Sequence, residues 1–60
     1  MNIDKIISEL ELEAEGVATS ANNPANIVHK TYLINAYIIR KAVIEELKEK
    51  DANERNQSAV

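Results

Sequence analysis

The residues most suited to chemistry gather in one stretch of the chain, residues 26–47. It holds the only histidine and both tyrosines of the sequence, together with three cationic side chains. Aromatic rings and cations bind nucleotides and other phosphates by stacking and charge-assisted hydrogen bonds. One prediction is therefore an anionic-ligand pocket at a junction between subunits. Its residues would be His29, Lys30, Tyr37, Arg40 and Lys41, with Tyr32 as a second ring.

The same residues have a simpler interpretation, which stays open beside the first. His29 suits a proton shuttle or a ligand contact, but it fits equally well as a partly exposed helix residue. The two tyrosines would then fill gaps beside the small residues Ala14 and Ala18 and hydrogen-bond through their hydroxyls.

Asn35 and an acidic run are the other polar features with two interpretations. Asn35 lies among apolar residues, where it either fixes the register of an assembly, as asparagine does in coiled coils, or touches water at a boundary. The acids Glu9, Glu11, Glu13 and Glu15 alternate every second residue. A helix divides such a run between two faces, which favours solvated carboxylates over a metal site.

Composition argues against catalysis. Sixty residues form one domain at most, and the absence of cysteine excludes disulfides, thiolate metal sites and thiol nucleophiles. A single histidine excludes a multi-histidine metal site. The chain has no nucleophile–base–orienter set, glycine-rich phosphate loop or pair of catalytic carboxylates. We therefore expect a protein that is not an enzyme and has no cofactor or metal.

Two helices and a short turn are expected to position these residues. Apolar residues at alternating spacings of four and three predict a first helix over 3–21, with Asn2 as its N-cap. These are Ile3, Ile7, Leu10, Ala14, Val17 and Ala21. Gly16 is the alternative end of this helix, because glycine is unfavourable inside helices. Pro24 predicts a turn at 22–23 and a second helix over 24–50, followed by a frayed or disordered tail, 51–60.

A short turn makes the fold all-α, an antiparallel helical hairpin in residues 1–50. A turn centred on 22–23 pairs residue i with residue 45 − i. This register predicts the neighbours Val17 with Val28, Ala14 with Thr31, Ile7 with Ile38, Ile3 with Ala42, Glu15 with Lys30, and Asp4 with Arg40 and Lys41. Residues 1–23 carry five acids and one lysine, and residues 24–44 carry three basic residues and no acid, so the charges favour this antiparallel pairing.

The second helix is apolar over most of its circumference. One partner helix covers only one stripe, so such a helix belongs in the interior of an assembly. We expect two or more hairpins to form a four-helix or larger bundle, with a homodimer favoured by two-fold closure. The expected oligomer interface is Leu33, Ile34, Tyr37, Ile38, Ile44 and Leu47, with Asn35 specifying the register.

The first function hypothesis is a small homo-oligomeric interaction protein that binds another protein as a regulator, inhibitor or adaptor, as small acidic helical proteins of bacteria and phages do. The alternative is the nucleotide-like ligand pocket. A further alternative follows from the expected architecture, which is similar to the plasmid copy-control Rop hairpins and implies RNA binding. The net charge of −3 argues against affinity for nucleic-acid backbones. No signal peptide or membrane span is recognisable, so we expect a cytoplasmic protein without a membrane partner.

Overall fold

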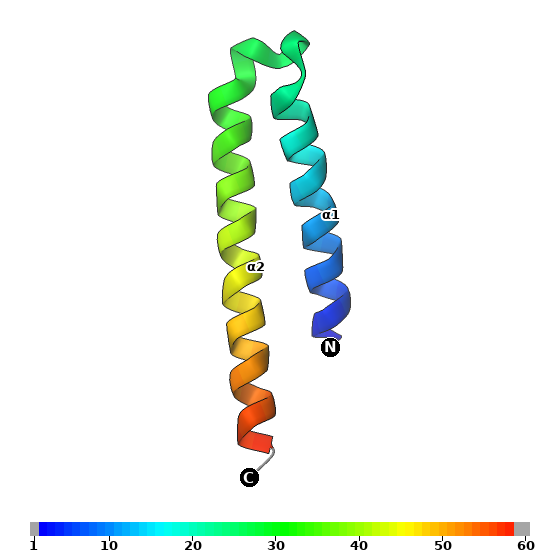
Figure 1. The fold of residues 1–60 in the computed structure, drawn as a ribbon, viewed down its shortest axis with the longest axis vertical. Coiled ribbons are helices and arrows are strands. Elements are labelled where there is room, and N and C mark those ends of the chain that lie inside the picture. Colours follow the sequence, from blue (N-terminus) through cyan, green and yellow to red (C-terminus); the bar gives the residue numbers. More distant parts are fainter. Residues whose placement is uncertain (1, 59–60) are drawn as a thin grey trace.

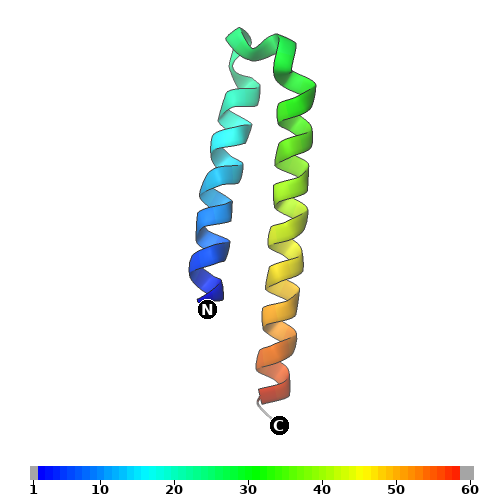
Figure 2. The ribbon, with the colours of Figure 1, turned by 180° about the vertical axis from the view of Figure 1, so that it is seen from behind.

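The computed structural model describes the backbone of residues 2–58 and the side chains of residues 2–56. Over this part of the chain, two α-helices are joined by a 3₁₀ helix, and there is no strand. The elements are α1 (Ile3–Asn22), η1 (Pro24–His29) and α2 (Lys30–Ser58). Both α-helices lie side by side and run in opposite directions, with η1 crossing between them at one end (Figure 1; Figure 2 shows the reverse side). The predicted all-α class is confirmed.

Helix α1 begins at a capped N-terminus. The backbone N–H of Lys5 donates to Oδ1 of Asn2 over 3.2 Å, which gives one of the unpaired amides of the first turn a partner. Asp4 places a negative charge in that turn, where the helix dipole favours it. The helix continues through Gly16 to Asn22, so the glycine does not end it.

The connection between the helices is longer than the predicted two-residue turn. Residues 24–29 form a 3₁₀ helix, and Asn26 has non-helical backbone angles, φ −102° and ψ 20°. The asparagine side chains hold the longer connection in place, because they bind backbone groups where α1 ends and η1 begins. Oδ1 of Asn23 accepts from the N–H of Ala25 over 3.0 Å, and Nδ2 of Asn26 donates to the carbonyl of Ser20 over 3.0 Å.

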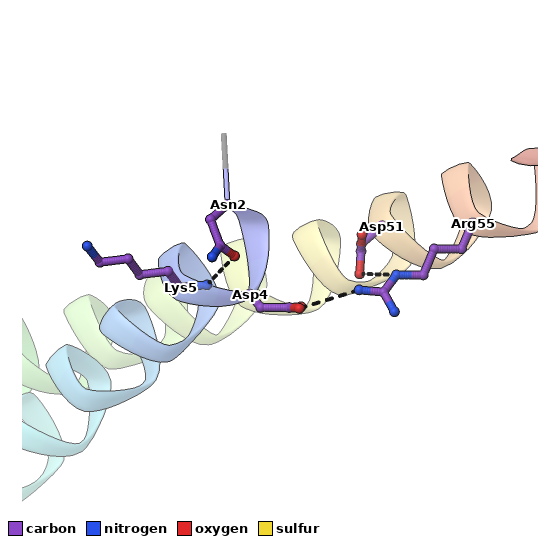
Figure 3. A network of polar contacts seen from close by, with 5 residues as sticks. All are labelled: Asn2, Asp4, Lys5, Asp51 and Arg55. Carbon is purple, nitrogen blue, oxygen red and sulfur yellow. Dashed lines mark hydrogen bonds and ion pairs between the residues drawn. The ribbon is translucent and has the colours of Figure 1, made fainter.

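Helix α2 extends past the predicted end at residue 50. Residues 51–58 continue the helix and project beyond the start of α1 (Figure 1). Nε of Arg55 lies 3.1 Å from Oδ2 of Asp51 one turn earlier, and its Nη2 lies 3.4 Å from Oδ2 of Asp4 on α1 (Figure 3). These ion pairs stabilise the helix in a polar segment. The segment has no apolar periodicity, so the sequence pattern did not predict a helix there. The last two residues of the predicted tail, 59 and 60, lie outside the described residues.

The pairing between the helices also differs from the predicted one. Ile7 packs in one buried cluster with Ile44, where the register i with 45 − i predicted Ile38. The register is shifted by six residues, which is the length of η1. Because η1 crosses between the helices, its residues do not pair with α1 as the predicted helix would. Asp4 likewise pairs with Arg55, where the predicted register placed it near Arg40 and Lys41. The ion pairs observed between the helices are Glu13 with Arg40, Glu11 with Lys48 and Asp4 with Arg55.

The core of the helix pair is a single small cluster. Ile7, Ala14 and Ile44 are buried, with Ile3, Leu10, Tyr37 and Leu47 packed against them. The structure measures 52 × 16 × 14 Å, and its radius of gyration is 14.8 Å, against about 10 Å for a compact domain of this length. Two helices of this length therefore bury one shared stripe and leave most other faces to solvent. Within residues 2–58, neither helix combines the length and apolar character needed to cross a bilayer.

Candidate functional site

One face of α2 packs against α1 within the chain. Ile44 is fully buried on this face, Tyr37 and Leu47 pack against the same cluster, and the half-buried Leu33 shares the face at helical spacing. We predicted all four residues as an oligomer interface. Ile44 has no surface left for a second chain, while Leu33, Tyr37 and Leu47 are partly exposed, so their place in an oligomer interface stays a prediction.

The opposite side of α2 and the adjoining η1 carry a second apolar surface, which we call the outer face. Its exposed large apolar residues are Ile27, Val28, Tyr32, Ile34, Ile38, Ile39 and Val43, with Thr31, Asn35 and Ala42 between them. Ile38 is 55% exposed and Ile39 62% exposed. At 100° per residue, Ile38 lies a third of a turn from Ile44 and Ile39 slightly more, both away from α1. Ile34 and Ile38, the other two predicted interface residues, therefore lie where another chain has access to them.

Asn35 lies in the middle of the outer face and is exposed. One helical turn away on either side are Thr31, Tyr32, Ile38 and Ile39. Its amide is thus the central polar group of an apolar surface. The predicted role in fixing an assembly register depends on whether a second chain covers this surface.

Within one chain, the residues of the predicted anion pocket are not brought together. His29 and Lys30 are exposed at the junction of η1 and α2, about 15 Å along the chain axis from Arg40 and Lys41. Nε and Nη2 of Arg40 each lie 2.8 Å from Oε1 of Glu13, and Nη1 donates to the carbonyl of Ala36 over 3.1 Å. The guanidinium of Arg40 is therefore already occupied by a carboxylate.

Tyr37 and Lys41 border a shallow cavity between the helices, of about 170 Å³. Its other lining residues are Glu11, Ala14 and Glu15. Two carboxylates at its edge oppose the binding of an anion. A second cavity of about 160 Å³ lies on the other side of Tyr37, beside Ala18 and Ala21. Tyr37 thus stands beside the small residues of α1, whereas Tyr32 is 74% exposed.

The acids of α1 are distributed around the helix. Glu11 lies 4.0 Å from Nζ of Lys48, while Glu13 binds Arg40. Among the described residues, no group of three or more histidine, cysteine or acidic side chains is arranged to hold a metal ion. No polar or charged residue is buried in the described part of the chain.

Leu12 is the exposed apolar residue on the outer side of α1. It is 69% exposed and lies half a turn around the helix from the buried seam of Ile7 and Ala14. Glu9 and Glu15, both exposed, lie one turn before and after it. The sequence pattern identifies Leu12 as an apolar residue outside the seam. It is the helix that brings the carboxylates of Glu9 and Glu15 next to it.

The sequence does contain a signal for the face of α2 that packs against α1. Residues 33, 37, 40, 44, 47 and 51 are spaced four, three, four, three and four apart, the spacing also found in α1. Arg40 and Asp51 place charged residues in this seam. Its apolar pattern is therefore weaker than that of the outer face, which dominates the sequence of the second helix.

Comparison with protein-family models, with curated proteins and with solved structures finds no match for this chain.

Proposed function

We propose that this chain is a non-enzymatic interaction protein, a helical hairpin that self-associates through the outer face and binds another protein through the outer side of α1. The observation that carries the proposal is the outer face itself. A contiguous apolar surface of this kind on a small protein marks a site of association with another chain. Covering it with a second hairpin would give the four-helix bundle expected from the sequence.

The exposed area supports association with a partner. The chain exposes 4800 Å². A compact monomer of 6.7 kDa exposes about 3900 Å² by the general relation between mass and surface. The excess, about 900 Å², is close to the roughly 800 Å² that each partner buries in an interface of standard size. One interface of ordinary dimensions would bring the chain to the surface area of a compact protein.

The outer side of α1 is the proposed contact with a regulated protein. Leu12 offers an exposed apolar anchor, and the carboxylates of Glu9 and Glu15 surround it. The partner that fits this surface has an apolar pocket bordered by basic side chains. Its approach would be assisted by the net charge of −3.

Light scattering over a range of concentrations tests self-association. We expect a mass of about twice 6.7 kDa at micromolar concentration and above. Ile39→Glu, which places a charge on the outer face, should lower the mass to that of the monomer. Leu12→Glu is the matched control on α1 and should leave the mass unchanged. A folded species of 6.7 kDa at millimolar concentration would overturn the proposal.

Binding to another protein is tested with the same pair of positions. The wild-type chain should retain a partner that survives washing, and Leu12→Ala should lose that partner while keeping its mass and helical content. The reverse result, loss of the partner in Ile39→Ala alone, would place the contact on the outer face. Failure to retain any protein across growth conditions would count against the regulatory part of the proposal.

A further inference from the structure

We infer that the outer face is covered by the outer face of a second copy of this chain, with the two α2 helices antiparallel and a two-fold axis passing beside Asn35. This inference rests on the proposed self-association and adds its geometry. It is carried by three independent features of the described residues: the symmetry of the outer face, the amide at its centre and the distribution of charge along α2.

The outer face is symmetric about Asn35 along the chain. A two-fold axis at residue 35 places residue i of one copy opposite residue 70 − i of the other. Within α2, the pairs formed are Thr31 with Ile39 and Tyr32 with Ile38. Every member of these pairs is an exposed residue of the outer face. The surface is therefore self-complementary in the sense that a two-fold interface requires.

Asn35 meets its own copy at the axis. A carboxamide carries both donors and acceptors, so two of them related by a two-fold axis can hydrogen-bond to each other. Burial of either amide without a partner would be unfavourable. A shift of one helical turn would place Asn35 against Ile38 or Ile39 and leave both amides unpaired. The amide thus selects one register among those that the apolar residues would allow.

The charges along the chain favour the antiparallel arrangement. Residues 24–44 carry three basic side chains and no acid, whereas residues 45–54 carry five acids and two lysines. Antiparallel packing places the acidic segments 45–54 of the two copies at opposite ends of the pair. Parallel packing would instead place like-charged segments beside each other, which is unfavourable.

Disulfide trapping tests this geometry, and the absence of cysteine makes each introduced thiol unique. Asn35→Cys lies at the axis, where facing helices bring the two Cα atoms within the roughly 7 Å that a disulfide needs. Ala42→Cys is the matched control: in this geometry it lies about 21 Å along the helix axis from its own counterpart. We expect rapid disulfide formation in Asn35→Cys and none in Ala42→Cys.

A mixture of Thr31→Cys and Ile39→Cys, which this register places opposite each other in α2, completes the test. Oxidation should give the mixed disulfide, identified by its mass, in at least tenfold excess over either symmetric product. Disulfides in Asn35→Cys and Ala42→Cys alike would demonstrate a parallel dimer, which overturns this inference but leaves self-association intact. A monomer by light scattering would overturn both.

Substitution of the amide gives a second, independent readout. Asn35→Asp places two carboxylates at the axis and should raise the dissociation constant of the dimer at neutral pH at least tenfold. Asn53→Asp is the matched control, because Asn53 is an exposed asparagine of α2 beyond the outer face. Its dissociation constant should change less than twofold. Equal effects of the two substitutions would show that Asn35 does not lie at the interface.

Discussion

Arg40 and Glu13 join the two helices, with both Nε and Nη2 of the guanidinium 2.8 Å from the same carboxylate oxygen. The pair lies one turn from the buried Ile44 on α2 and next to the buried Ala14 on α1. This ion pair therefore shows which residues of the two helices lie opposite each other near the middle of the core. A turn of only two residues would have placed Arg40 near Asp4 instead.

Exchanging the charges of this pair tests the register. Glu13→Arg or Arg40→Glu alone should lower the free energy of unfolding by up to about 1 kcal/mol, because both side chains are partly exposed. The double variant should recover most of that loss, measured by urea unfolding followed by circular dichroism. The control exchanges Asp4 with Arg40. Recovery in that combination would support the shorter turn and contradict the structure.

The helices themselves were predictable because their signals are local. Asn2 and the seam from Ile3 to Ala21 specify α1, and Pro24 separates the helices. The register was not predictable from the same reasoning, since it depends on how far η1 carries the chain. That length is set by hydrogen bonds from Asn23 and Asn26, which short-range preferences alone do not determine.

The sequence predicted that the second helix has an uncovered apolar surface, but not which residues form it. The excess of apolar residues on the second helix indicated apolar surface that one partner helix cannot cover, and the structure leaves such a surface exposed. The choice of face depended on the register, and Ile44, expected at an oligomer interface, is buried against α1 within the chain. The helical continuation through Asp51 and Arg55 depends partly on Asp4, which is distant in sequence.

Gly16→Ala should stabilise the protein. Gly16 lies inside α1 with a helical backbone, and nothing lies within 4 Å of the position a Cβ atom would take. Alanine is favoured over glycine in a helix by about 1 kcal/mol, which corresponds to a rise in melting temperature of about 4–8 °C for a domain of this size. Thermal unfolding by circular dichroism measures it. A decrease would show that another chain packs closely against this side of α1.

Asn26→Ala should loosen the connection between the helices. The side-chain amide of Asn26 donates to the carbonyl of Ser20 over 3.0 Å, at the end of α1. Its loss should cost about 1 kcal/mol in the free energy of unfolding. Hydrogen exchange should increase for the amides of residues 22–30 and remain unchanged near Ile7. Asn22→Ala serves as the control, because this exposed asparagine lies in the same segment.

Ile44→Ala and Ile38→Ala should separate the two apolar faces of α2. Ile44 is fully buried against α1, so its truncation leaves a cavity in the core of the helix pair and should cost about 2–5 kcal/mol at every protein concentration. Ile38 is 55% exposed, so its truncation should leave the helix pair intact and weaken the contact between copies.

Concentration is the variable that distinguishes these effects. The melting temperature of a dimer rises with protein concentration, because association stabilises the folded chain by mass action. Ile38→Ala should therefore lower the melting temperature most where the wild-type protein is dimeric and least at high dilution, where the wild type is monomeric. Ile44→Ala should lower it under both conditions. If Ile38→Ala were equally damaging at high dilution, then Ile38 would pack against α1, and the register predicted from a two-residue turn would be restored.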